Sequence, residues 1–383
     1  MQGSGSWERP GWSDTKRGLF TVIFLVACFS FEPDWDWDLP EHFAQPRVPK
    51  DNPMTAAKFD LGRLLFYDVR LSVNQQTSCA TCHQQKLSFT DGLSHSVGAT
   101  GEKHPRSSMS LANIAYSSHL TWANPMLKRI EHQMLIPMFG EEPIELGLAG
   151  KESDVEQIYR QDLQIKKAFE RAFPDSSEPV TIDHITQAIA VFLRGLISKD
   201  TPYDRYLMGE KNALNPQEKK GMELFFSERL ECFHCHAGFN FSDSVDDEGN
   251  PFAGLAFHNT GLYSLDKEGS YPSENQGLYA FTQKIEDKGK FKAPSLRNIE
   301  VTAPYMHDGS LESLEDVLEH YALGGREITE GPNKGDGAQN PNKSEFVSGF
   351  ILMKDEKEAV IAFLETLTDE RFLNNPDYSD PWD

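Results

Sequence analysis

The chain has 383 residues, with 59 Asp and Glu against 37 Lys and Arg, and a formal net charge of -22 at neutral pH. Such an acidic chain offers no basic surface to offset the phosphate charges of DNA or RNA, so we expect no nucleic-acid partner. Hydrophobic residues make up 38% of the chain, which is ordinary for a globular protein, and the length suffices for two domains.

The first residues resemble an export signal. Lys16 and Arg17 precede an apolar run over residues 19–27, which ends directly before Cys28 in the manner of a bacterial lipobox. This run is too short to span a bilayer. We therefore predict a lipoprotein-type signal peptide over residues 1–27 and a periplasmic protein attached to a membrane only through a lipid on Cys28. An ordinary signal peptide with a spare cysteine is the alternative.

Residues 28–53 contain five prolines, which predicts an extended arm. Thr55 is a good N-cap for a helix that leads into residues 62–71, and Thr181 can cap a later helix. That later helix has an apolar face made of Ile182, Ile185, Ile189, Phe192, Leu193 and Leu196. Because Pro202 interrupts the pattern, we place a domain boundary after residue 200.

Two motifs with the spacing Cys-x-x-Cys-His carry the main chemical signal, and their residues are Cys79, Cys82, His83, Cys232, Cys235 and His236. Such a motif attaches a c-type haem through two thioether bonds and supplies the proximal histidine of the iron. A zinc site or a pair of redox dithiols would need the cysteines but not the histidine after each pair. We therefore predict two covalently bound haem c groups.

The sequences around the two motifs are similar. Residues 221–230, which precede the second motif, repeat the pattern of residues 62–71 before the first. After the motifs, Phe89-Thr90-Asp91 is matched by Phe241-Ser242-Asp243. This internal repeat indicates a duplication.

The duplication predicts a mainly α-helical fold with two cytochrome c-like domains, residues 54–200 and 201–383, each holding one haem. Asn215 and Pro216 favour the start of a helix in the second domain. A last helix is marked by Val360, Phe363, Leu364 and Leu367. Residues 326–348 are polar and predict a loop, and strand signals are few.

Further segments have a recognisable order: Asn52-Pro53-Met54-Thr55 and Leu61-Gly62 precede the first motif, and residues 291–299 and 302–310 follow the second. In these segments the chain resembles the bacterial di-haem cytochrome c peroxidase and MauG family, from about residue 47 to residue 370. The resemblance implies a haem-dependent enzyme that acts on hydrogen peroxide.

The family also implies that the two haems differ. The haem on His83 is expected to react with peroxide, and the haem on His236 to have a second protein ligand. That ligand is a methionine in the peroxidases and a tyrosine in MauG, and the matching position here is Tyr321. The periodicity agrees, because one helical face is shared by Leu314, Val317, Leu318 and Tyr321. Met306 and His320 are the alternative ligands.

The resemblance implies further site residues, which are Trp122 between the two haems and Gln133, Pro137 and Glu145 on the distal side of the first. One carboxylate is needed there to move a proton between the two oxygens of bound peroxide. Glu141 and Glu142 are alternatives to Glu145 in this role.

Two more expectations come from the family. His95 and His104 stand in the segment that supplies a removable histidine to the first haem of many peroxidases, but we expect both to be exposed, which leaves that haem open. The family also binds calcium between its domains, so one Ca²⁺ is expected. Thr302 and Pro304 match two of its positions, and Ser107 falls at the third.

The leading hypothesis is a MauG-like enzyme that uses hydrogen peroxide to form a high-valent di-haem state, which oxidises a Trp or Tyr side chain of a secreted partner protein. Within the family, the di-haem enzymes paired with copper-binding proteins, as in methanobactin operons (MbnH-like), are the most similar. The alternative is a cytochrome c peroxidase that reduces peroxide with electrons from a small cytochrome. A third hypothesis is an electron-transfer cytochrome with two six-coordinate haems.

Overall fold

The computed structural model describes residue 1 and residues 35–250 and 256–382. Contacts between Cα atoms divide the chain into Met1–Pro33 and Asp34–Asp383, and all described helices and strands belong to the second unit. The predicted signal peptide and Cys28 lie outside the described residues, apart from residue 1. Among the described helices, none combines the length and the apolar character that a membrane crossing requires.

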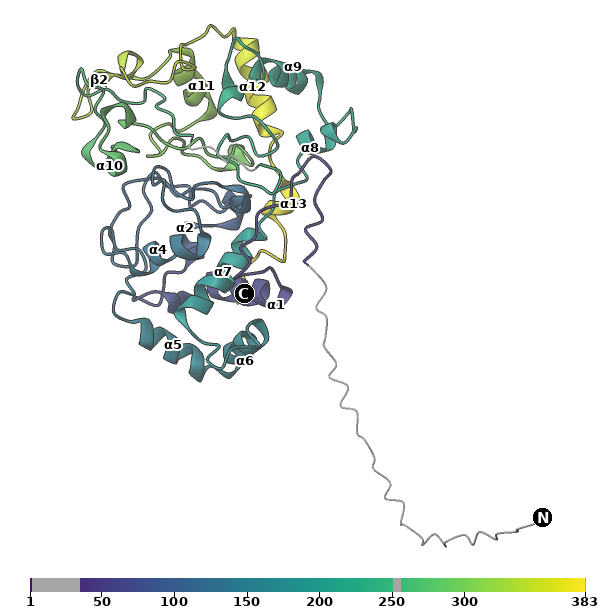
Figure 1. Ribbon diagram of the computed structural model, residues 1–383. Coiled ribbons are helices and arrows are strands. Elements are labelled where there is room, and N and C mark those ends of the chain that lie inside the picture. Colours follow the sequence, from purple (N-terminus) through teal and green to yellow (C-terminus); the bar gives the residue numbers. More distant parts are fainter. Residues whose placement is uncertain (2–34, 251–255, 383) are drawn as a thin grey trace. The chain divides into compact units, whose positions relative to one another are not determined.

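The second unit is mainly α-helical, as predicted (Figure 1). Its α-helices are α1 (Ala56–Phe66), α2 (Cys79–Cys82), α3 (Ile130–Gln133), α4 (Leu135–Phe139), α5 (Glu152–Gln161), α6 (Leu163–Ala172), α7 (Ile182–Arg194), α8 (Pro202–Leu207), α9 (Pro216–Phe225), α10 (Tyr279–Thr282), α11 (Leu314–Ala322), α12 (Lys354–Glu365) and α13 (Glu370–Leu373). Strands β1 (Glu327–Ile328) and β2 (Gly335–Asp336) form one antiparallel pair with Glu327 opposite Asp336. Short 3-10 helices include η3 (Ile114–Tyr116), η4 (Cys232–His234) and η7 (Ile299–Val301).

Helix α1 precedes the first motif in the sequence and α7 follows it, and the two helices pack against each other. The predicted caps are confirmed, because the hydroxyl of Thr55 accepts the Lys58 amide and that of Thr181 accepts the His184 amide. The helices approach most closely at Gly62, where a side chain would overlap the carbonyl oxygen of Ala188. A glycine is therefore needed at this crossing.

Helices α9 and α12 form the same kind of pair around the second motif. The side chain of Asn215 caps α9 and Pro216 occupies its first turn, which confirms the predicted start. A side chain at Gly221 would overlap the carbonyl oxygen of Ala359, just as at the first crossing. The repeat in the sequence is thus a repeat of helix packing.

Each helix pair has a separate hydrophobic core. The first core contains buried side chains of α1, α5, α6 and α7, and the second contains those of α9, α11 and α12. Phe372 and Leu373 of α13 join the first core, so the end of the chain returns to the residues with which the helical body begins. The predicted last helix corresponds to α12, and α13 after it was not predicted.

Over residues 35–53 the arm before α1 contains turns, bends and one isolated bridge residue and otherwise no regular element. It is held by His42, whose Nε2 lies 3.0 Å from Asp204. Asp204 also accepts two hydrogen bonds from the guanidinium of Arg297, at 2.8 and 2.9 Å, and both side chains are fully buried. Burial alone would raise the pKa of Asp204, but the hydrogen bonds and charge of Arg297, together with the hydrogen bonds from His42 and the Thr201 amide, outweigh it and lower that pKa.

Three details of the predicted elements were wrong. Leu367, predicted in the last helix, lies beyond the end of α12 at Glu365, because Thr366 follows as its C-cap. Leu196 lies beyond the end of α7 at Arg194, because Gly195 follows as its C-cap. The predicted loop over residues 326–348 contains the β1–β2 pair, which is too short to leave an alternating apolar pattern.

Candidate functional site

His83 follows α2 directly, and its ring orientation is fixed from behind. Its Nδ1 lies 2.7 Å from the carbonyl oxygen of Phe89 and 3.3 Å from the hydroxyl of Ser108. A carbonyl oxygen only accepts, so Nδ1 carries the proton and Nε2 keeps a lone pair for a metal. Burial lowers the pKa of His83, which favours this neutral form.

His236 repeats this arrangement in the second motif. Its Nδ1 lies 2.9 Å from the carbonyl oxygen of Phe241, and burial lowers its pKa as well. Phe89 and Phe241 are fully buried and have φ values of 61° and 49°, which turn their carbonyls toward the rings. The repeated tripeptides after the motifs thus supply the hydrogen-bond acceptors of the two histidines, a role that the sequence pattern alone did not reveal.

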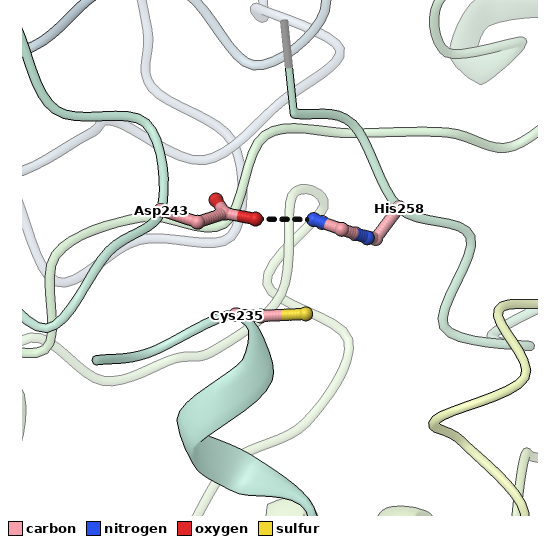
Figure 2. A group of neighbouring side chains, drawn as sticks. All are labelled: Cys235, Asp243 and His258. Carbon is pink, nitrogen blue, oxygen red and sulfur yellow. Dashed lines mark hydrogen bonds and ion pairs between the residues drawn. The ribbon is translucent and has the colours of Figure 1, made fainter. Parts of the chain in front are cut away.

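The third residue of each tripeptide is an aspartate near the second cysteine of its motif. Asp91 accepts a hydrogen bond of 2.6 Å from the hydroxyl of Ser96. Asp243 instead pairs with His258 at 2.6 Å, and Figure 2 shows the two side chains facing each other beside the sulfur of Cys235. Because of Asp243 and then Cys235, the pKa of His258 rises to about 10. No sequence motif contains His258, so the sequence alone carries no signal for its contact with Asp243.

None of the four motif cysteines forms a disulfide, and the two pairs do not come together as a joint zinc site. Within residues 35–250 and 256–382, two groups could hold a metal: one is Cys235, Asp243 and His258, and the other is Glu228, Glu231 and His234. Neither contains cysteines of both motifs. The geometry therefore fits two separate haem attachments better than one four-cysteine zinc site.

Residues of the predicted distal side gather around α3 and α4. Gln133 ends α3, and its Oε1 is buried with no hydrogen-bond partner among the described residues. Pro137 lies in α4, and its carbonyl accepts the Leu146 amide at 2.9 Å. This bond, and one from the Ala99 amide to the Glu145 carbonyl at 2.6 Å, hold the Glu145 backbone beside α4.

Glu145 is the best placed of the three candidate acids. Its carboxylate is close enough to Cys79 and Cys82 to contribute to the raised pKa of both thiols, of which burial is the main cause. Burial also raises the pKa of Glu145 itself to about 7. Glu141 and Glu142 are exposed. Partly buried Glu145 thus lies near the first motif with a pKa suited to proton transfer at neutral pH.

An apolar cavity surrounds the second motif. Cys232, Cys235 and His236 line it together with Tyr321 of α11. Burial raises the pKa of Tyr321, so its phenol is neutral unless a metal binds its oxygen. The alternative ligand Met306 also lines the cavity, whereas His320 does not.

Lys292, which we had not predicted as a site residue, is buried in the same cavity. Its Nζ donates to the carbonyl of His119 at 2.6 Å, and among the described residues no carboxylate forms an ion pair with it. Burial lowers its pKa to about 8. A buried ammonium without a counter-charge fits a group that brings its own carboxylates, as the propionates of haem do.

Trp122 belongs to the surroundings of the second motif. Its Nε1 donates to the carbonyl of Ser107 at 2.9 Å, and its own carbonyl accepts the Lys292 amide at 2.8 Å. Its side chain lines the cavity that contains His236 and Tyr321. The expected position of Trp122 between two haems stays a prediction.

The remaining predicted residues are less clearly placed. His95 and His104 are partly buried, so our expectation that both are exposed was wrong. The Nδ1 of His104 accepts the Arg106 amide at 3.1 Å. The amide of Ser107 donates to the carbonyl of His307 at 2.9 Å, which brings it to the segment of Thr302 and Pro304. The three expected calcium positions are therefore on adjacent segments.

Together these features define a c-type di-haem protein with two unlike sites. Residues 56–212 match the family model for di-haem cytochrome c peroxidase. The chain is 32% identical to the methylamine utilization protein MauG of Methylorubrum extorquens, over 84% of this chain and 81% of that protein. It is 36% identical to the cytochrome-c peroxidase IdrP1 of a Pseudomonas species, over 84% and 83%.

A solved structure gives a further match. It is described as a MauG-like protein associated with microbial copper homeostasis, and it is 47% identical with a TM-score of 0.89. The match covers 91% of this chain and all of that one (100%). The chain therefore belongs to the di-haem cytochrome c peroxidase and MauG family, whose members are haem-dependent peroxidase-type enzymes.

Proposed function

We propose that this protein is a MauG-like enzyme of the periplasm, with two cytochrome c-like domains over residues 54–200 and 201–383. It uses hydrogen peroxide to oxidise a Trp or Tyr side chain of a secreted partner protein. The observation that carries this proposal is the position of Tyr321, which lines the cavity that also contains His236 and its cysteines. A methionine at this position would favour the cytochrome c peroxidase alternative.

The choice of tyrosine matters because of the charge on the ligand. When bound, the haems supply peroxide activation and electron transfer. A phenolate from Tyr321 is a hard anion that stabilises the higher oxidation states of iron, whereas a thioether stabilises Fe(II). A tyrosine-ligated site of low potential is a poor entry point for electrons from a small cytochrome, but a good reservoir for oxidising equivalents.

On the other side, Glu145 handles the protons of peroxide. As a carboxylate it would take the proton from the inner oxygen of peroxide and return it to the outer oxygen, so that the O–O bond breaks with loss of water. The two electrons that this cleavage needs would come from the bound first haem. The unpartnered Oε1 of Gln133 is available to accept a hydrogen bond from peroxide or water, and Pro137 holds the Glu145 segment through its carbonyl. Trp122 provides an aromatic route between the two sites.

Lys292 supports the same assignment on the binding side. We propose that its ammonium pairs with a propionate of the second haem, next to Trp122. Since Lys292 has no carboxylate partner among the described residues, the cofactor would supply its counter-charge.

A kinetic comparison tests the proposal. Hydrogen peroxide is mixed with the di-haem protein in the presence of reduced small cytochrome c, and its consumption is measured. We expect turnover far below the usual enzymatic rate of about 10 per second. In parallel, a candidate secreted partner protein is treated with enzyme and peroxide, and mass spectrometry should find an oxidised Trp or Tyr. Fast cytochrome-dependent turnover with no partner oxidation would show that the protein is a cytochrome c peroxidase.

The similarity to a MauG-like protein associated with copper homeostasis supports a copper-binding partner as the first one to try. We also propose one Ca²⁺ at Thr302, Pro304 and Ser107, which metal analysis of the purified protein would detect. A lipid on Cys28 is proposed as the membrane anchor. Replacing Cys28 with serine should release the protein from membranes during cell fractionation.

A further inference from the structure

Two buried asparagines occupy equivalent places in the repeat. Asn113 precedes η3 and Asn298 precedes η7, with φ values of 57° and 60°. The sequences match, since Ser110-Leu111 precedes the first and Ser295-Leu296 the second by the same spacing. Both asparagines are fully buried.

Each asparagine is held by the turn that follows the second helix of the packed pair in its own half. That turn follows α7 for Asn113 and α12 for Asn298. The Asn113 amide donates to the Leu196 carbonyl at 2.9 Å, and its Oδ1 accepts the Ser198 amide at 2.7 Å. For Asn298 the partners are the Leu367 carbonyl and the Asp369 amide, both at 2.8 Å. The backbones and side-chain oxygens are therefore fixed.

The side-chain nitrogens reach into the opposite half. Nδ2 of Asn298 donates to the hydroxyl of Ser88 at 3.0 Å, and Nδ2 of Asn113 donates to Oδ1 of Asn240 at 3.2 Å. Ser88 directly precedes Phe89, and Asn240 directly precedes Phe241. We call these two hydrogen bonds the cross-braces.

We call residues 88–89 and 240–241 the acceptor loops, because they contain the two Phe carbonyls. A serine of the same half donates a hydrogen bond to each acceptor loop. Ser110 Oγ donates to the Ser88 carbonyl and Ser295 Oγ to the Asn240 carbonyl, each at 2.7 Å. Two contacts thus fix the position of each Phe carbonyl that accepts the Nδ1 hydrogen bond of a proximal histidine. The serine contact comes from the same half of the chain, and the asparagine contact comes from the opposite half.

We propose that Asn298 and Asn113 are positioning residues that act crosswise: Asn298 sets the hydrogen bond of His83, and Asn113 sets that of His236. This inference rests on the proposed attachment of one haem to each motif. A stronger Nδ1–H hydrogen bond makes the ring a more basic ligand and lowers the potential of the iron it holds. Each half of the chain therefore adjusts the haem of the other, in addition to any charge transfer through Trp122.

Glycine is the best test substitution, because it retains the left-handed backbone that alanine would strain. In the reduced di-haem protein, N298G should shift the Fe–His83 stretching band, seen by resonance Raman spectroscopy, to lower frequency. The EPR g values of the second haem should stay unchanged. N113G should affect the other haem. It should raise the midpoint potential of the second haem and leave the Fe–His83 band at its native frequency.

Two further variants separate this effect from a loss of structure. S88A removes the acceptor of the first cross-brace without touching Asn298, so it should reproduce the Raman shift of N298G. N340G removes another buried asparagine of the C-terminal half, whose side chain bonds to Tyr263, Gly269 and Asn342 and not to an acceptor loop, and it should leave both haems unchanged.

A pyridine haemochrome assay first counts the haems. If fewer than two are attached, the proposed function itself fails. Suppose instead that two haems are attached. If N298G then perturbs only the haem on His236 and N113G only the haem on His83, or if neither variant perturbs a haem, the crosswise role is overturned while the proposed function stays intact.

Discussion

Replacing Glu145 with glutamine tests the proton-transfer role, because the variant keeps the shape of the side chain but cannot accept the proton. General acid–base catalysis contributes about 10²- to 10⁴-fold, so E145Q should slow the reaction with peroxide by about that factor. The exposed Glu141 and Glu142 provide matched controls, since E141Q and E142Q remove the same charge nearby and should change the rate less than about twofold.

The pH dependence gives a second magnitude. With a pKa of about 7, Glu145 is mostly protonated at pH 6 and mostly ionised at pH 8. If the ionised form accepts the proton of peroxide, the rate constant should rise about tenfold between these pH values. Stopped-flow absorbance at the haem bands would follow this rise, and the rise should be absent in E145Q.

Stability should respond in the opposite direction. The pKa is raised from an ordinary 4.5 to about 7 in the folded protein, so folding is favoured below pH 4.5 and this advantage is lost as the pH rises through 7. Above that pH the buried carboxylate costs about 3 kcal/mol. E145Q should therefore unfold at higher urea concentration than the native protein at pH 8, but not at pH 4.5. A native rate profile retained by E145Q, or lost in E142Q, would refute the assignment.

Three further changes have definite expected outcomes. Tyr321→Met exchanges an anionic ligand for a thioether and should raise the midpoint potential of the second haem in a spectroelectrochemical titration, whereas an unchanged potential would mean that Tyr321 is not a ligand. Asp204→Asn leaves Arg297 buried without its counter-charge and should lower the free energy of unfolding by about 3–5 kcal/mol, against less than about 1 kcal/mol for E358Q in the exposed Lys354–Glu358 pair. Lys292→Met removes the proposed partner of a propionate and should shift the potential of the second haem downward, and a K292R variant should restore it.

The sequence predicted those parts of the site that depend on local spacing. The motif cysteines and histidines, the caps at Thr55, Thr181 and Asn215, and the inward face of α11 all follow from residues a few positions apart. Such signals survive in a single sequence because one turn of helix or one short motif contains the whole pattern.

The parts that were missed depend on contacts between distant segments. His258 meets Asp243 across a loop, and Lys292 becomes a buried cation only because the surrounding chain closes over it. The exposure of His95 and His104 was misjudged for the same reason, since no local pattern reports which segment covers a loop.

The repeat shows where these two kinds of information meet. The tripeptides at Phe89 and Phe241 were visible as a pattern, but their purpose required the ring nitrogens of His83 and His236 to be seen beside them. Because both proximal histidines have the same kind of acceptor, the difference between the two sites must arise elsewhere. It arises on the opposite sides, where Glu145 stands near the first motif and Tyr321 lines the second cavity. Under the proposed function, a duplicated scaffold with unlike distal groups separates peroxide chemistry from the storage of oxidising equivalents.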